Sequence, residues 1–317
     1  MKIAVLMGGP SAEREVSLRS GEAVYQALSI RNHEVKKLEI SDRIAAELQS
    51  FRPEVVFIAA HGKPGEDGTI QGLLEILGLP YTGSRVLASA LAMDKIASKR
   101  IFLATDIPTP EFMVFGAQEI RDLTPVKVAA QIIEETGLPA VIKAPTQGST
   151  IGTYIVREEG KLPEAIEAAL QYDSRILAER FVPGPEITAA VLGNDDPVVL
   201  PLIEIISRTG FYDYQAKYTA GLSEHLIPPR LPEKVQKEIR DLALRTYKTL
   251  GCRGFARIDF IVEDGQKPKV LEVNTVPGLT EVSLFPDAAR AAGMGFADLV
   301  EKIISLALED FRNLRKE

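Results

Sequence analysis

Residues 269–280 read KVLEVNTVPGLT and predict a short β-strand that runs into a Pro-Gly turn. Successive side chains of a strand point to opposite faces, so Glu272 and Asn274 share one face while Leu271 and Val273 share the other. Two oxygen-bearing side chains are unusual on one face of a strand in the middle of a large globular chain. This polar face therefore indicates a functional role for Glu272 and Asn274.

A partner strand is predicted directly upstream, where residues 254–262 read GFARIDFIV. Arg257 and Asp259 share one of its faces, and if the turn DGQK closes symmetrically they lie opposite Asn274 and Glu272. Two like charges that face each other across a ladder destabilise it, so something must neutralise Asp259 and Glu272. Carboxylate and amide oxygens at this spacing are ligands that Mg²⁺ accepts, with phosphates completing its shell.

The alternative for this face is a solvated polar surface on which Arg257 neutralises one acid. The Pro-Gly turn that follows the strand favours a ligand site, because its glycine lets backbone N–H groups come close to a ligand beside the metal. The pattern thus predicts Asp259, Glu272 and Asn274 as metal ligands.

The composition is typical of a soluble folded protein of two or three domains, with 317 residues, 45% apolar and 26% charged. The net charge of −7 and the lack of a long basic run argue against an extended nucleic-acid surface and favour a small substrate. No apolar run approaches the roughly 20 residues that a membrane helix needs, and MKIAVLMGGP predicts a first strand and not a signal peptide. Cys252 is the only cysteine, which excludes an internal disulfide and fits a reducing compartment, so we expect a cytoplasmic protein.

The pattern of strands and helices changes twice along the chain. Residues 1–85 alternate apolar strands with a long amphipathic helix, which predicts a small parallel α/β sheet whose strand-end loops hold ligands. Residues 86–178 predict a smaller α+β unit, and residues 179–317 predict longer strands with two long helices, so we expect a three-domain fold of α/β and α+β class. The expected strands lie at residues 2–7, 34–40, 54–60, 140–143, 186–192, 198–206, 254–262 and 269–274, and the two long helices at about 232–250 and 295–312.

Neither a P-loop nor a dinucleotide fingerprint occurs, so any phosphate site must be built in another way. Lys95, Lys143 and Lys217 stand at loop or strand edges from which they could reach phosphates, although each one alone predicts a solvated surface lysine. The stretch Gln147–Gly152 supplies flexible backbone N–H donors that could fold over phosphates; its alternative is a plain hairpin turn.

Further loops are candidates for ligand contact. Residues 177–187, LAERFVPGPEI, predict a strand, a break and a second strand. An adenine could lie at the break, with Glu186 at a ribose hydroxyl; the alternative is a plain linker between two domains. Residues 207–222, SRTGFYDYQAKYTAGL, predict a lid that is mobile until nucleotide binds. His61 is either a ligand contact or a solvated loop histidine, and Glu13 begins a helix, where the helix dipole favours an acid in any case.

Together these stretches resemble the D-alanine:D-alanine ligases, bacterial cell-wall enzymes of the ATP-grasp superfamily. The resemblance covers the whole chain and rests on nine motifs in order: GGPSAEREVSL, AAHGKPGEDGTIQG, YTGS, MDK, QGSTIG, GPEIT, FYDYQAKY, GFARIDF and LEVNTVPGLTEVSLFP. General ATP-grasp similarity implies the lysines and the metal site, whereas the Glu13 segment and the YDYQAKY lid point to this family.

The resemblance implies that ATP phosphorylates one D-alanine on its carboxylate and that the amine of a second D-alanine attacks the acyl phosphate, giving a dipeptide for peptidoglycan. It implies two Mg²⁺ or Mn²⁺ ions at the three predicted metal ligands, and ATP between the central and C-terminal domains. The implied ATP-binding residues are Lys95, Lys143, Glu179, Arg180, Phe181, Val182, Glu186 and Lys217. The implied catalytic residues are Glu13, Ser149, Tyr218, Arg257 and Gly278, and the implied substrate-binding residues are His61, Ser283 and Leu284. Glu13 would bind the ammonium of the first D-alanine and, with Ser149 and Tyr218, would latch the lid. Arg257 and the Gly278 N–H would stabilise the developing negative charge. The N–H groups of Ser283 and Leu284 would bind the carboxylate of the second D-alanine.

Some positions depart from the family pattern. Lys143 is followed by Ala144 where the family commonly has proline, Thr150 stands where a second serine is frequent, and Arg180 replaces a usual lysine. Glu281 places an acid near the site of the second carboxylate, and we expect it to face solvent because a buried acid would repel the substrate.

Other functions remain as alternatives. A noncatalytic nucleotide-binding protein should have lost Arg257 or a metal ligand, and an oxidoreductase should carry the dinucleotide fingerprint. Among ligases the alternatives are another ATP-grasp carboxylate-amine ligase and a D-alanine:D-lactate ligase. Tyr218 disfavours the D-lactate ligase because ester-forming relatives tend to lack this tyrosine. The expected partners are D-alanine and ATP, with no nucleic acid and no membrane, and the resemblance implies a homodimer.

Overall fold

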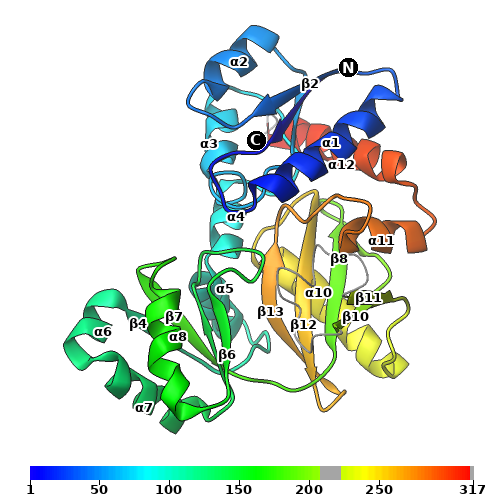
Figure 1. The fold of residues 1–317 in the computed structure, drawn as a ribbon. Coiled ribbons are helices and arrows are strands. Elements are labelled where there is room, and N and C mark those ends of the chain that lie inside the picture. The colour runs from blue at the N-terminus through cyan, green and yellow to red at the C-terminus, as the bar shows by residue number, and fades with distance from the viewer. Residues whose placement is uncertain (208–222, 315–317) are drawn as a thin grey trace.

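The fold contains three separate β-sheets in a computed structural model that describes residues 1–207 and 223–314 (Figure 1). The first sheet is parallel, with the order β2-β1-β3, and it confirms the parallel sheet expected near the N-terminus. Its strands are β1 (Lys2–Met7), β2 (Glu34–Glu39) and β3 (Val55–Ile58), and its helices are α1 (Arg14–Ser29), α2 (Ile44–Phe51) and α3 (Thr69–Ile76). Helices α4 (Val86–Met93) and α5 (Lys95–Ala104) lead from this part to the second sheet.

The second sheet is antiparallel, with the order β4-β7-β5-β6, and its apolar residues pack against three helices. Its strands are β4 (Phe112–Gly116), β5 (Ala140–Lys143), β6 (Thr153–Val156) and β7 (Arg175–Arg180). Its helices are α6 (Ala117–Leu123), α7 (Pro125–Thr136) and α8 (Leu162–Ala169), the last preceded by a 3₁₀ turn at Glu159–Lys161. The antiparallel pair β5–β6 shows that the glycine-rich stretch between them is the loop of a hairpin.

The third sheet has the order β11-β10-β8-β12-β13, with β9 beside β8. Its strands are β8 (Glu186–Leu192), β9 (Val198–Val199), β10 (Ile203–Ser207), β11 (Ser223–Leu226), β12 (Phe255–Glu263) and β13 (Lys267–Asn274). Its helices are α10 (Glu233–Thr249), α11 (Leu284–Ala291) and α12 (Phe296–Leu314). The expectation of one strand over residues 198–206 is wrong, because Pro201 lies between β9 and β10 and has no N–H to continue a ladder.

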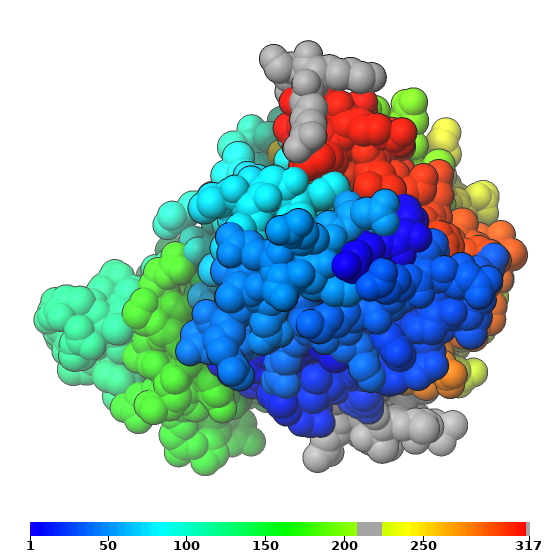
Figure 2. Space-filling model, turned by 90° about the horizontal axis from the view of Figure 1, so that it is seen from above, coloured from blue at the N-terminus to red at the C-terminus, as the bar shows by residue number. Residues whose placement is uncertain are grey.

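The first and third sheets share one apolar core. Val5 and Phe57 of the first sheet belong to the same buried cluster as Phe285 of α11 and Ile303 of α12. Helix α12 packs on α1, so the last described helix covers the first one. Figure 2 shows these two ends side by side on one face, with the central part of the chain projecting away from them.

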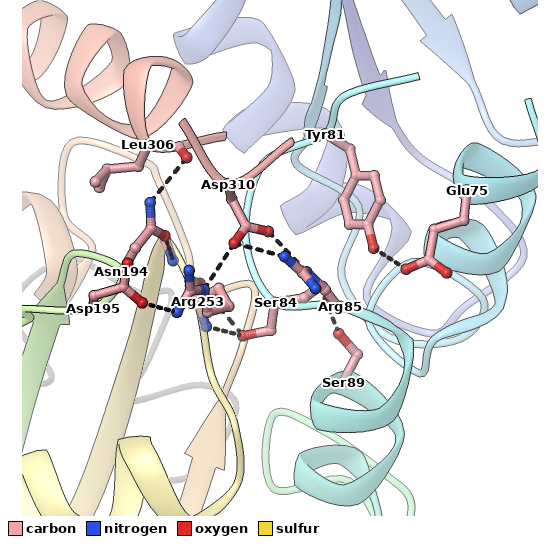
Figure 3. Close-up of polar contacts among 11 residues, drawn as sticks. Glu75, Tyr81, Ser84, Arg85, Ser89, Asn194, Asp195, Arg253, Leu306 and Asp310 are labelled. Atoms are coloured by element: carbon pink, nitrogen blue, oxygen red, sulfur yellow. Dashed lines mark hydrogen bonds and ion pairs between the residues drawn. The ribbon is translucent and has the colours of Figure 1, made fainter. Parts of the chain in front are cut away.

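A polar cluster fixes the joint between these parts (Figure 3). Asp310 of α12 accepts two hydrogen bonds from Arg85 at the start of α4, each 2.9 Å long, and one of 2.8 Å from Nε of Arg253. Arg253 also donates to Asp195 at 2.6 Å, and it lies two residues before β12. One buried carboxylate therefore ties α12, α4 and the start of β12 together.

One of the two expected domain boundaries lies between secondary-structure elements, and the other lies inside a strand. Residue 85 immediately precedes α4, whereas the boundary between residues 178 and 179 falls inside β7. The three-part division stays a prediction. Within residues 1–207 and 223–314, none of the helices combines the length and the apolar character that a membrane crossing requires.

Candidate active site

The β12–β13 ladder has the register that the sequence predicts. Arg257 lies opposite Asn274, and Asp259 lies opposite Glu272. The register shifts directly after this second pair, between Asp259 and Phe260. The two acids and the amide therefore share one face beside a local irregularity of the sheet.

Cationic side chains of the same chain neutralise both acids. Asp259, 6% exposed, accepts hydrogen bonds from Arg257 Nη2 at 2.8 Å, Asn274 Nδ2 at 3.1 Å and Thr188 Oγ1 at 2.7 Å. Glu272 pairs with Lys95 Nζ at 3.1 Å. Charge repulsion across the ladder therefore does not by itself require a metal ion, which corrects that step of the sequence argument.

The donor set nevertheless fits Mg²⁺ in its chemistry, because Asp259, Glu272 and Asn274 supply hard oxygen ligands on one face. Across the described ranges, no group of three or more His, Cys, Asp or Glu side chains could hold a metal ion. Two carboxylates and one amide would thus need further oxygens, and phosphates at this place would supply them. The metal role of the three residues stays a prediction.

Two adjoining cavities lie at this ladder, and the larger of the two, about 360 Å³, lies between the second and third sheets. Its lining includes the predicted nucleotide residues Lys95, Lys143, Glu179, Arg180, Phe181, Val182 and Glu186, together with Asp259 and Glu272. The break between β7 and β8 supplies Phe181 and Val182, while Glu179 and Arg180 end β7 and Glu186 begins β8, so residues 177–187 form the strand, break and strand that the sequence predicts. Lys217 lies outside the described residues, as does the expected lid apart from Ser207, which lines this cavity.

A buried charge triad lies beside this cavity and includes a lysine that sequence reasoning missed. Glu179 pairs through Oε1 with Lys99 at 2.8 Å and through Oε2 with Lys143 at 2.6 Å. Burial lowers the pKa of Lys99 to about 8. Burial alone would raise the pKa of Glu179, but the two lysines lower it below its usual range. The available signal was spacing, because Lys99 stands four residues after Lys95 and so lies on the same side of α5.

The hairpin loop after β5 is tied to α5 by Lys95. The Nζ of Lys95 donates to the carbonyl of Gln147 at 2.7 Å, and its backbone N–H donates to the carbonyl of Pro145 at 3.1 Å. Ser149 and Thr150 have left-handed φ values of 47° and 65°, which are uncommon for residues other than glycine. The loop is therefore held in a specific shape over the site.

A smaller cavity of about 50 Å³ adjoins the first, and Glu272 lines both. Its lining brings together the predicted residues Glu13, His61, Ser149, Arg257, Gly278, Ser283 and Leu284. Ser149 Oγ donates a short hydrogen bond to the carboxylate of Glu13. Ser283 precedes α11 as predicted, and a Cβ on Gly278 would come within 2.9 Å of its Oγ, so a larger residue at 278 would require the Ser283 side chain to shift. Tyr218 lies in the segment that the structure does not describe.

His61 uses both ring nitrogens on the protein itself. Its Nδ1 donates to the carbonyl of Val276 at 2.9 Å, and its Nε2 accepts from Ser20 Oγ at 2.9 Å. The Ser20 hydroxyl in turn accepts from the N–H of Leu279 at 3.2 Å. Burial lowers the pKa of His61, which favours this neutral tautomer. The histidine thus fastens the turn after β13 to α1, and its substrate-binding role stays a prediction.

Glu66 is a second residue that sequence reasoning missed. It is 7% exposed, lines the smaller cavity and accepts a hydrogen bond from the Gly62 N–H at 3.0 Å. Burial, followed by the charge of Glu13, raises the pKa of Glu66 to about 8. Its position inside the motif GKPGEDG was the available signal. Glu281 is exposed, as expected.

Comparison with known proteins places this chain in a family. The model described as D-ala D-ala ligase C-terminus matches residues 101–305, and the model described as D-ala D-ala ligase N-terminus matches residues 36–84. The D-alanine–D-alanine ligase of Moorella thermoacetica is 64% identical over 310 residues, which are 98% of this chain and 100% of that protein.

Solved structures agree with the sequence relatives. The D-alanine–D-alanine ligase of Bacillus anthracis in complex with ATP matches with a TM-score of 0.84 and 31% identity, over 99% of both chains. The VanG D-Ala:D-Ser ligase of Enterococcus faecalis matches with a TM-score of 0.80 and 31% identity, over 96% of this chain and 99% of that one. These neighbours confirm the expected ATP-grasp architecture. The chain belongs to the D-alanine–D-alanine ligase family.

Proposed function

We propose that this protein is an ATP-dependent D-alanine:D-alanine ligase that makes D-alanyl-D-alanine for peptidoglycan. The observation that carries the proposal is the position of Glu272, which lines both the larger and the smaller cavity. A nucleotide in the first cavity and an amino acid in the second would meet at this carboxylate. Such a meeting point suits phosphoryl transfer from ATP to a substrate carboxylate.

The larger cavity suits a nucleotide. Phe181 and Val182 give an apolar wall for a base, and Glu186 offers a carboxylate for ribose hydroxyls. Lys95 and Lys143 offer positive charge to phosphates, and Lys217 is the further lysine implied by the family. Arg180 lines the same cavity while its guanidinium pairs with Glu111 and Glu263.

The smaller cavity suits the two amino acids. The Glu13 carboxylate would bind the ammonium of the first D-alanine, whose carboxylate oxygen attacks the γ-phosphorus of ATP and displaces ADP. The amine of the second D-alanine then attacks the acyl carbon, phosphate leaves, and the amine loses a proton as the peptide bond forms. Arg257 and the Gly278 N–H would stabilise the oxyanion of that step, and the N–H groups at Ser283 and Leu284 would hold the second carboxylate.

Divalent ions held by Asp259, Glu272 and Asn274 would compensate charge on the phosphates during transfer. To bind them, Glu272 would release Lys95 and Asp259 would release part of its Arg257 contact, so that the ions replace these cations on the carboxylates and Lys95 becomes free to face phosphate oxygens. We further propose a homodimer in the cytoplasm; sedimentation velocity of the purified chain tests the dimer.

One assay tests the main proposal and its alternatives. Release of ADP is measured with ATP, Mg²⁺ and either D-alanine alone, L-alanine, or D-alanine mixed with D-lactate or D-serine. We expect turnover with D-alanine alone and none with L-alanine. Faster turnover with D-lactate or D-serine as second substrate would favour an ester-forming or D-serine-adding ligase, and no D-alanine-dependent ADP release would refute the proposal.

A further inference from the structure

The triad of Lys99, Glu179 and Lys143 carries one more positive charge than negative. Lys99 and Glu179 are fully buried, with 0% and 1% exposure, whereas the side chain of Lys143 keeps 13% and lines the larger cavity. Lys99 does not line that cavity, so it cannot touch a ligand there directly. Its effect on a nucleotide must pass through Glu179.

Lys99 is fixed on the far side of Glu179. Its Nζ donates to Thr109 Oγ1, and the hydroxyl of Thr109 donates to the carbonyl of Val270 in β13 at 2.7 Å. The ammonium also lies 5.6 Å from the ring centre of Phe112. These contacts join Lys99 to β4 and β13, so it can stay beside Glu179 when Lys143 moves.

The position of Lys143 poses a conflict if the proposed function holds. In the structure its Nζ is bound to Glu179, but a lysine that binds phosphate must direct its ammonium into the cavity. If Lys143 were the only partner of Glu179, that movement would leave a buried carboxylate without a counter-ion, which is strongly unfavourable. With Lys99 present, Glu179 keeps a cation throughout.

We propose that Lys99 is a positioning residue that lets Lys143 exchange Glu179 for a nucleotide phosphate. The proposal rests on the proposed function, since it assumes a nucleotide in the larger cavity. Lys99 remains the permanent partner of Glu179, and Lys143 is the exchangeable one. The extra positive charge of the triad is then available to the phosphates.

The test is nucleotide binding by calorimetry, with a non-hydrolysable ATP analogue and Mg²⁺, for the whole chain and four variants. Lys99→Met should weaken binding at least tenfold, because Lys143 is then held by Glu179, whereas Lys99→Arg should bind within about threefold of the unmodified protein. Glu179→Gln removes the carboxylate that holds Lys143. In the Glu179→Gln background, adding Lys99→Met should change the affinity for the analogue little, because there is no longer a carboxylate at residue 179 that needs a counter-ion.

The outcomes separate the two proposals. Failure of the unmodified protein to bind the analogue refutes the proposed function. If it binds, then equal affinity of Lys99→Met, or an equal loss from Lys99→Met with and without Glu179→Gln, overturns the role of Lys99. Should Lys99→Met fail to fold, the comparison of Glu179→Gln with the double variant decides, because weaker binding by the double variant contradicts the proposal.

Discussion

Replacing Glu272 by glutamine should almost abolish turnover, because Glu272 lines both cavities and is a proposed metal ligand. The substitution keeps the size of the side chain and removes its charge. Loss of charge compensation on the transferred phosphoryl group should raise the barrier by about 4 kcal/mol, which lowers the rate roughly a thousandfold.

The same substitution should slightly destabilise the protein without metal. Glu272 pairs with Lys95 at 3.1 Å, and the two side chains are 24% and 11% exposed. A hydrogen bond to a charged group contributes about 1.5–3 kcal/mol, and the new amide oxygen can still accept from Lys95, so we expect a loss of about 1 kcal/mol. Relief of repulsion from Asp259 is a small offset, since Arg257 already neutralises that acid.

Two measurements check Glu272→Gln: thermal unfolding without divalent ions, and Mg²⁺-dependent ADP release with D-alanine. The matched control is Glu34→Gln in β2, an exposed acid that pairs with Lys2 at 3.7 Å. It should leave both readouts unchanged. Near-normal turnover of Glu272→Gln would show that the strand face is not the metal site, and a clear rise in Tm would refute the charge balance described for the ladder.

Variants at three other polar groups should each give a distinct signature. Asp310→Asn removes the anion shared by two arginines and should lower the free energy of unfolding by about 2–4 kcal/mol in urea denaturation; a change below about 0.5 kcal/mol would contradict its role in the joint. The pKa of Glu66 is raised to about 8 in the folded state, so between about pH 4.5 and 8 the folded state binds more protons than the unfolded state. The contribution of Glu66 therefore lowers the free energy of unfolding more and more as the pH rises through that range. Glu66→Gln should therefore gain Tm relative to the unmodified protein from pH 5 to 8, and parallel Tm curves would count against it. Ser149→Ala removes the hydrogen bond to Glu13 and should raise the KM of the first D-alanine about tenfold, at the low end of the 1.5–3 kcal/mol typical of bonds to charged groups; an unchanged KM would exclude this contact from substrate binding.

The ladder could be predicted from sequence because it depends on local rules. Side-chain alternation and a short turn determine which residues of two consecutive strands face each other, so Asp259 and Glu272 could be paired correctly. Their counter-ions could be predicted only in part. Arg257 is a neighbour on its own strand, whereas Lys95 reaches Glu272 from a helix far away in the sequence.

Lys99 shows the limit of motif reasoning. Its spacing from Lys95 indicates a helix face, but nothing in the local pattern shows that Glu179 lies opposite it. That contact depends on how α5 packs against the second sheet, and the local sequence does not determine this tertiary packing. The split of the strand at residues 198–206 is a different kind of error, because Pro201 was visible and its missing N–H was not taken into account.

The packing of α12 on α1 also has a consequence for how the chain folds as it is synthesised. The first sheet is made before α12, yet its apolar side chains Val5 and Phe57 share their core with Ile303, which leaves the ribosome much later than they do. Until then this apolar surface is open to water and to other nascent chains. We therefore expect a chain that stops before Phe296 to bind chaperones or aggregate, even though every strand of the sheet and both cavities have already been made.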